Sequence, residues 1–306
     1  MKAFLLLLFA LAVMVCTGGP LRGQEKAAAA ADVALPVGKI AYVTSENFGR
    51  SGNIFLMAGN VRTMTLAHQT RDLEFVDGGR SILYSANDPE AKGIHLYDLT
   101  LHTNTRLLPR NDEADSPALS PDGKRIAFVQ GGESGSQIMT AALDGTDLKQ
   151  VTDGPGFNWT PRWSPDGRRL LFETTRNEPP GGGEAGGHRD LYVMDADGSH
   201  LTNLTEGSYG HNASWSPDGK FIAYMKYGDI FTMKSDGSEK KNISKAKTRD
   251  SEPAWSPDGQ WIAFTRTPEG RNAMDIWIMK SDGTQQRPIT FNTGTTTSYS
   301  PSWGKE

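Results

Sequence analysis

The tetrapeptide Ser-Pro-Asp-Gly occurs four times in this chain of 306 residues, and its spacing limits the folds that the chain can adopt. The copies begin at residues 120, 164, 216 and 256, and a degenerate copy, FVDGGRSILY, occupies residues 75–84. Each intact copy follows Leu119, Trp163, Trp215 or Trp255 and precedes a strand-like run such as KRIAFV. A period of about 45 residues indicates a repeat architecture, in which each repeat buries its apolar face against its neighbours. The 3.6-residue periodicity of helical repeats is missing, which leaves a β architecture.

Each Ser-Pro-Asp-Gly segment has the chemistry of a tight turn. Serine suits the first position of a type I turn, and proline fixes φ at the second. Aspartate accepts hydrogen bonds from nearby backbone N–H groups, and glycine supplies the positive φ that follows. The segment therefore predicts a hairpin between two strands, and we interpret its aspartates as structural residues.

A second turn, centred on Asp-Gly, recurs in residues 138–152, 191–205, 230–244 and 276–290, with looser copies in residues 54–67 and 94–108. Asp-Gly between alternating segments is a strong hairpin signal. Each repeat is therefore predicted to form four antiparallel strands, as in a propeller blade. The repeat count predicts an all-β, six-bladed β-propeller of four-stranded blades. We expect residues 298–303 to pair with the blade formed by residues 40–66, so that both termini close the ring.

The N-terminal segment has the pattern of a secretory signal peptide. Met1 and Lys2 precede an apolar run at residues 3–15, which is too short for a membrane span. We predict a signal peptide at residues 1–24, a linker at residues 25–37 and a propeller at residues 38–306, and hence a periplasmic or secreted protein. Cys16 is the only cysteine, so no intramolecular disulfide can form. Lipid attachment at Cys16 is an alternative to its removal with the signal.

The composition excludes some classes of partner. The formal net charge is -4, whereas a protein that binds the phosphate backbone normally shows a basic field, so we expect no nucleic-acid partner. No apolar run of about 20 residues follows residue 20, and we therefore expect no membrane span. We also expect a monomer without a cofactor or a metal.

The repeats resemble the TolB-type, WD40-like PD40 repeat. The residues that carry the resemblance are Trp-Ser-Pro-Asp-Gly followed by Ile-Ala-Phe, and a later strand that ends in Met-x-x-Asp-Gly. The resemblance covers residues 38–306 and implies a periplasmic six-bladed propeller that binds a lipoprotein at the wide mouth of its channel. TolB proteins carry a further N-terminal α/β domain that engages an inner-membrane partner. Only a linker precedes the first strand here, so we expect a stand-alone TolB-like propeller.

The residues just before each inner strand are the candidate ligand-binding residues, because they should surround the channel mouth. Loops of variable sequence on a rigid scaffold commonly carry binding sites. The candidates are Arg71, Asp72, Asp115, Trp159, His211, Asn212, Glu252 and Tyr299. Their mixture of charges and aromatic rings suits a peptide or a glycan, and we predict a protein or peptidoglycan-associated partner. The alternative is that several of them only hydrogen-bond neighbouring loops.

Motifs of catalysis are missing from the sequence. It contains no GxSxG, HExxH or CxxC motif, and its six histidines fall at different positions of their repeats. A non-catalytic binding scaffold is therefore the main hypothesis. The alternative is a small carbohydrate-active or lactonase-like enzyme that uses channel-mouth carboxylates such as Asp115 and Glu252. The tryptophans that recur at one repeat position, Trp163, Trp215, Trp255 and Trp303, are predicted to pack between blades.

Overall fold

A computed structural model of the protein describes residues 35–305, except residues 37, 47–51, 60, 90, 109–112, 133–134, 155 and 178–187. The chain divides into two compact units, Met1–Asp32 and Val33–Glu306. The predicted signal peptide, Cys16 and most of the predicted linker lie outside the described residues. Leu35, at the end of that linker, is buried against the first strand of the second unit. No helix among the described residues is long and apolar enough to cross a membrane.

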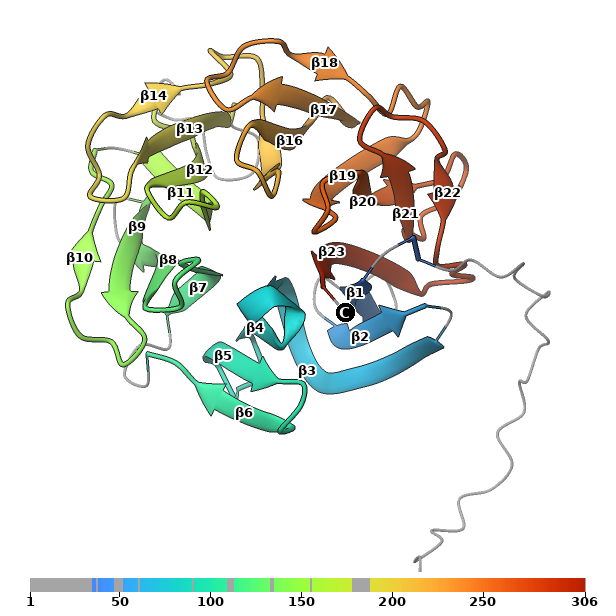
Figure 1. The fold of residues 1–306 in the computed structure, drawn as a ribbon, viewed down its shortest axis with the longest axis horizontal. Helices are drawn as coiled ribbons and strands as arrows, with labels where there is room; N and C mark the ends of the chain where they lie inside the picture. The colour runs from blue at the N-terminus through green and yellow to red at the C-terminus, as the bar shows by residue number, and fades with distance from the viewer. Residues whose placement is uncertain are drawn as a thin grey trace, which may run out of the picture. The chain divides into compact units, whose positions relative to one another are not determined.

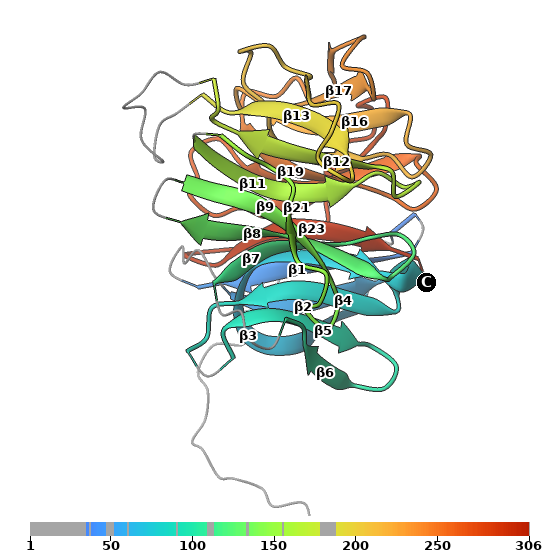
Figure 2. The same ribbon diagram turned by 90° about the vertical axis from the view of Figure 1, so that its left-hand side faces the viewer.

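The second unit is an all-β propeller, in which sheets follow one another around a ring (Figure 1). Its single helical element among the described residues is a short 3-10 turn, η1 (Asp77–Gly79). Figure 2 shows the ring from the side, where β8 (Arg125–Gly132), β11 (Gly156–Trp163) and β23 (Thr297–Gly304) run between its two faces. The turns of the repeats therefore alternate between the two faces.

Backbone hydrogen bonds join the strands into four sheets. The first, in spatial order, contains β23, β1 (Lys39–Ser45), β2 (Gly52–Ala58), β3 (Val61–Val76), β4 (Ser81–Ala86), β5 (Gly93–Asp98) and β6 (Thr103–Arg106). The second contains β14 (Thr202–Asn203), β13 (Asp190–Asp195), β12 (Arg169–Thr174), β11, β9 (Gly135–Ala142), β8 and β7 (Ala114–Leu119), with β10 (Lys149–Gln150) paired to β9. The third contains β15 (His211–Trp215), β16 (Phe221–Lys226), β17 (Asp229–Lys234) and β18 (Lys241–Asn242). The fourth contains β19 (Arg249–Trp255), β20 (Trp261–Thr267), β21 (Asp275–Lys280) and β22 (Arg287–Pro288).

The number of sheets differs from the expected six separate four-stranded blades. Strand β3 has 16 residues and pairs with β2 through its first part and with β4 through its second part, which joins two predicted blades into one sheet. Strands β9 and β11 pair in parallel at two positions, Gly135 with Gly156 and Ser136 with Phe157, which joins two more. The repeats alone do not reveal these connections, because they depend on contacts between repeats.

Both ends of the propeller meet in the first sheet, as the sequence predicts. Strand β23 pairs with β1 in antiparallel register, from Lys39 opposite Gly304 to Ser45 opposite Thr297. In Figure 1 the last strand accordingly lies beside the first. This pairing leaves β1 hydrogen-bonded on both sides, because β2 occupies its other edge.

The Ser-Pro-Asp-Gly segments form the predicted hairpin turns. In the first, the Ser120 hydroxyl donates to Asp122 Oδ1 at 2.6 Å and accepts the backbone N–H of Arg125 at 2.9 Å. Gly123 has a φ of 70°, in the left-handed region that glycine occupies without strain. Successive turns also contact one another: a Cβ added to Gly167 would lie 3.6 Å from Pro121 Cδ in the turn before it. The turns therefore form a packed rim on one face of the ring.

The core consists of buried clusters that each combine two successive repeats. One cluster joins Ala118 of β7 and Ile138 of β9 to Trp163 and Leu170 in the following repeat. The indole N–H of Trp163 donates to the Ala118 carbonyl at 3.2 Å, and that of Trp215 donates to the Arg162 carbonyl at 3.3 Å.

The other two repeat tryptophans occupy comparable clusters. Trp303 packs with residues of β1 and β21, and the half-buried Trp255 packs with residues of β17 and β20. The prediction that these tryptophans lie between repeats is confirmed.

Deletion of residues 298–306 should destabilise the propeller strongly. Without β23, one edge of β1 loses its hydrogen-bonding partner and the buried Ile40, Ala41 and Tyr42 lose their cover. We expect aggregation or loss of cooperative unfolding, measured by size-exclusion chromatography and thermal melting. A truncated chain that stays monomeric and melts within a few degrees of the wild type would contradict this role of β23.

Trp163→Ala should lower the free energy of unfolding by ~3–5 kcal/mol, because it empties a buried site and leaves the Ala118 carbonyl without its donor. Urea denaturation measures the change. Phe291→Ala is the control, because this ring is exposed and its removal should cost less than about 0.5 kcal/mol. Equal effects of the two substitutions would argue against a core role for the indole.

Candidate functional site

The second part of β3 and five further inner strands contain a β-bulge at the same position of the repeat. In each of β7, β11, β15, β19 and β23 the register shifts, and a residue other than glycine adopts the left-handed backbone conformation. These residues are Ser116, Thr160, Asn212, Glu252 and Ser300, with φ between 47° and 54°. Such backbone is costly outside glycine and asparagine, and it concentrates where side chains serve a binding site. A bulge also re-aims the side chains that follow it.

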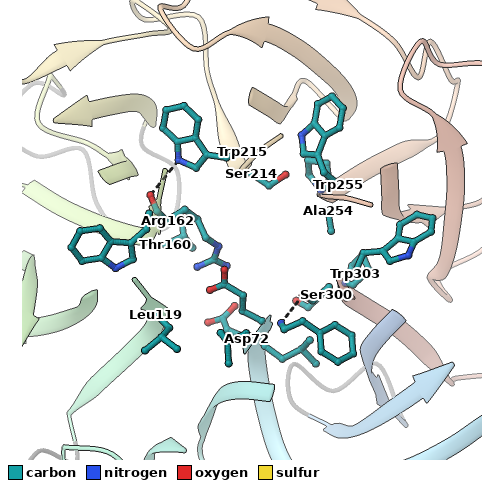
Figure 3. A pocket seen from close by; sticks show the side chains of 18 of the residues that line it. Asp72, Leu119, Thr160, Arg162, Ser214, Trp215, Ala254, Trp255, Ser300 and Trp303 are labelled. Carbon is teal, nitrogen blue, oxygen red and sulfur yellow. Dashed lines mark hydrogen bonds between the residues drawn. The ribbon is translucent and has the colours of Figure 1, made fainter. Parts of the chain in front are cut away.

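The inner strands enclose a channel cavity of about 450 Å³. Thr160, Asn212, Glu252 and Ser300 are among its lining residues, so the bulges place four of their five left-handed residues at the cavity. In Figure 3 the Arg162 side chain extends into the cavity, whereas the indoles of Trp215, Trp255 and Trp303 point away from its centre.

Four carboxyl side chains, those of Asp72, Glu74, Asp77 and Glu252, line the cavity together with one guanidinium, that of Arg162. Burial raises the pKa of Asp72 to about 6; the Asp115 carboxylate adds to the rise, and Arg162 only partly opposes it. Burial likewise raises the pKa of Glu74, again with partial opposition from Arg162. Glu74 Oε2 is buried without a hydrogen-bond partner among the described residues. Ser116 donates its hydroxyl to Asp72 Oδ2 at 3.2 Å. The cavity therefore has a surplus of acidic groups.

Glu252 links two neighbouring repeats. Its Oε2 accepts the Thr265 hydroxyl at 2.7 Å and the backbone N–H of Ser300 at 2.8 Å. Ser300 begins the bulge of the next inner strand, so Glu252 fixes the position of that strand. Glu252 thus hydrogen-bonds residues of β20 (Trp261–Thr267) and β23 and also lines the cavity.

Glu173 of β12 forms an equivalent link beside the channel. Its Oε1 accepts the Thr160 hydroxyl and the backbone N–H of Asn212, both at 2.7 Å. Its Oε2 accepts from Arg189 at 3.1 Å and lies 3.6 Å from His211 Nδ1. Burial by itself raises the pKa of Glu173, but His211, Arg189 and Thr160 together outweigh it and lower the pKa to about 2. Glu173 is therefore a buried anion that holds its neighbours in place.

The candidate residues do not form one continuous ring. Asp72, Asn212 and Glu252 line the cavity, whereas Trp159 and His211 lie in the cluster around Glu173. Asp115 accepts the backbone N–H of Ser116 at 2.8 Å beside the mouth. Tyr299 is buried in the core, and the side chain of Arg71 lies outside the described residues. Tyr299, Trp159 and His211 precede the bulges and do not line the cavity, and ligand contact at the channel mouth stays a prediction for all eight candidates.

Several cavity residues were missed by the sequence analysis. Glu74 and Arg162 line the channel two positions after Asp72 and Thr160, at equivalent places in their repeats. The repeat alignment contained this signal, because alternate residues of a strand share a face. Glu173 could not be found in this way, since its contacts come from strands of two different repeats. The described residues contain no group of three or more His, Cys, Asp or Glu side chains that could hold a metal ion.

Comparison with known proteins supports the propeller fold. No family model matches the chain. An uncharacterized protein of Agrobacterium fabrum is 30% identical over 194 residues, which are 59% of this chain and 63% of the relative. The Tol-Pal system protein TolB of Alcanivorax borkumensis is 31% identical over 97 residues, which are 31% of this chain and only 22% of that protein. The matches thus span less than two thirds of either relative.

Solved structures extend the likeness over most of the chain. The crystal structure of TolB from Acinetobacter baumannii has a TM-score of 0.72 at 22% identity and covers 88% of this chain and 67% of its own. An oligogalacturonate lyase in complex with manganese has a TM-score of 0.54 at 15% identity, over 84% of this chain and 75% of its own. Proteins of this fold therefore include both a TolB protein and a lyase.

Asp72→Asn should stabilise the protein at neutral pH. The native state holds a proton on Asp72 up to a pKa of about 6, against 3.8 for an ordinary aspartate, so stability contributed by this group falls as the pH rises from about 4 to 6. The substitution should raise the free energy of unfolding at pH 7 by about 1–3 kcal/mol and flatten this dependence. Urea denaturation across that range measures both effects.

Asp122→Asn is the matched control. Hydrogen bonds from Ser120 and the Lys124 backbone lower the pKa of Asp122, so its neutralisation should reduce stability. A loss of stability in Asp72→Asn as well would contradict the assignment of Asp72 as a destabilising buried acid.

Proposed function

We propose that the protein is a non-catalytic, TolB-like binding scaffold that recognises a protein or cell-envelope ligand at its channel mouth. The observation that carries the proposal is the pair of half-buried acids, Asp72 and Glu74, which line the cavity with the single guanidinium of Arg162 and whose pKa values are raised by burial. Buried charges without full compensation lower the stability of the free protein. Groups of this kind in an open cavity are typical of functional sites, since a ligand can complete their interactions.

Because acidic side chains outnumber cations in the cavity lining, we expect the ligand to insert a cationic group. A lysine, an arginine or an amino terminus of a partner would neutralise Asp72 and Glu74 and donate hydrogen bonds to them. Glu74 Oε2 is an acceptor still available for such a donor among the described residues. The remaining polar lining, such as Thr160 and Ser300, would fix the orientation of the inserted group.

We infer further that the four sheets comprise six blades. Six buried clusters support this count, because each combines residues of two successive repeats around the ring. In this interpretation the two parts of β3 belong to different blades, and the short β9–β11 pairing is a contact between two others. The signal-like residues 1–24 and the relation to TolB support a periplasmic location.

The enzymatic alternative is supported by the fold shared with an oligogalacturonate lyase. The hydrogen bonds of Glu252 and Asp115 argue against these residues as the catalytic carboxylates of such an enzyme. Glu252 accepts three hydrogen bonds from Thr265 and Ser300 in neighbouring strands, and Asp115 accepts the backbone N–H of the adjacent Ser116. These carboxylates are therefore better suited to structural roles than to proton transfer.

The double substitution Asp72→Asn with Glu74→Gln should abolish partner capture without unfolding the protein. Immobilised wild-type and variant proteins would be exposed to periplasmic extract, and captured proteins quantified by mass spectrometry and then tested in purified form. We expect at least a tenfold loss of affinity, because the charges that face the ligand are removed while the side-chain shapes remain. Thermal melting should be unchanged or raised.

Asp197→Asn with Asp236→Asn is the control for this experiment. Both residues lie in exposed Asp-Gly turns, where each accepts hydrogen bonds from the serine two positions later. Their neutralisation should leave partner capture intact. If the control loses capture while the cavity variant retains it, the ligand binds the other face of the ring.

A further inference from the structure

A row of aromatic side chains lies outside the channel cavity, on elements between β11 and β17. The aromatic row consists of Phe157, Trp159, His188, Tyr209 and Tyr227. Phe157 and Trp159 stack with ring centroids 5.5 Å apart, His188 and Tyr209 are 4.1 Å apart, and Tyr209 and Tyr227 are 5.2 Å apart. None of the five lines the channel cavity. The elements that carry the row adjoin one another in the upper part of Figure 1.

Arg189 connects the two parts of the row. Its guanidinium lies 3.9 Å from the centre of the Trp159 ring, and its chain neighbour His188 bonds through Nε2 to the Tyr209 hydroxyl at 2.5 Å. Glu173 holds Arg189 in this position with an ion pair of 3.1 Å. The geometry of the row is therefore held by the protein itself. The buried Glu173 carboxylate positions the Arg189 guanidinium, which in turn positions the Trp159 indole.

Two tyrosines of the row occupy strained backbone. Tyr209 and Tyr227 have φ values of 57° and 53°, in the left-handed region that bulky residues avoid. Tyr227 and Gly228 form the two-residue turn between β16 and β17, where asparagine is favoured at the first position. The Tyr227 side chain is 69% exposed, so core packing does not explain its presence. Strain of this kind is common where a side chain is held for a ligand.

The charges beside the row favour an anionic ligand. The Lys226 ammonium lies 5.4 Å from the Tyr227 ring, and no carboxylate of the described residues pairs with it. Arg189 is the second cation, and its partner Glu173 is buried below it. The surface thus combines the exposed rings of His188 and Tyr227 and the half-buried rings of Phe157, Trp159 and Tyr209 with positive charge.

We propose that the aromatic row binds a linear acidic polysaccharide, whose sugar rings stack on the aromatic faces and whose carboxylates contact Lys226 and Arg189. Sugar rings have apolar C–H faces that pack on indole and phenol rings, and carboxylates form charge-assisted hydrogen bonds with both cations. The ring planes turn along the row, by 32° between His188 and Tyr209 and by 55° between Tyr209 and Tyr227, which suits a twisted polymer.

An alginate fragment, a hexasaccharide of mannuronic acid, is the probe for calorimetry with the full-length mature protein. We expect measurable binding that weakens with salt, and binding of neutral cellohexaose that is at least tenfold weaker. Lys226→Gln with Tyr227→Asn should reduce the affinity for the uronate about tenfold or more, because it removes one charge and one stacking face while asparagine tolerates the turn. The part of the tryptophan fluorescence change that Trp159→Phe abolishes gives an independent readout of occupancy, because the chain has seven tryptophans.

Two control variants test whether the effect is specific to the aromatic row. Lys240→Gln with Phe291→Asn removes an exposed cation and an exposed ring elsewhere and should bind the uronate like the wild type. Asp72→Asn should also bind it like the wild type, because the row lies outside the channel cavity. Failure of the channel proposal would therefore leave this result unchanged.

The proposal is overturned if the uronate does not bind, or if the Lys226 and Tyr227 variant binds it as tightly as the wild type. Equal binding of uronate and cellohexaose would overturn the role of the cations. A proline-rich acidic peptide is the remaining comparison. If the peptide binds through the same two residues and the uronate does not, the row is a peptide site.

Discussion

Burial between successive repeats holds this protein together. The chain has one cysteine, so no disulfide can form within it, and the described part of the chain contains only one short helical turn. Each apolar cluster combines side chains of neighbouring repeats, and the indoles of Trp163 and Trp215 add hydrogen bonds to the preceding inner strand. A repeat cannot bury its apolar face alone, so the stability of each depends on the next one around the ring.

Hydrogen bonds between successive inner strands also hold the repeats together, and they position the residues that line the channel cavity. The buried Glu173 and the half-buried Glu252 join one inner strand to the next through the backbone N–H of Asn212 and Ser300. Both acceptors act on left-handed residues at a bulge, which are the residues that line the cavity. The contacts that align the repeats therefore also set the shape of the candidate site. Asp72 accepts the Ser116 hydroxyl of the next inner strand, whereas Glu74 Oε2 accepts no hydrogen bond among the described residues.

The sequence predicted what depends on local chemistry. The Ser-Pro-Asp-Gly turns, the pairing of β23 with β1 and the interior position of the repeat tryptophans follow from short motifs and their order. The joining of blades by β3 did not follow, because it depends on one strand continuing across a repeat boundary. The bulges were missed for a related reason: one additional residue reverses the faces of a strand, which places Tyr299 in the core.

The position of β1 between β2 and β23 has a mechanical consequence. A pulling force applied through the residues that precede β1 would act on a strand whose two edges are both hydrogen-bonded. The strand could be extracted only by breaking two ladders together, one to the following strand and one to the last strand of the chain. We therefore expect the sheet in which the two ends of the propeller pair to resist a force applied through the residues before β1, and not to be the first part of the propeller to open.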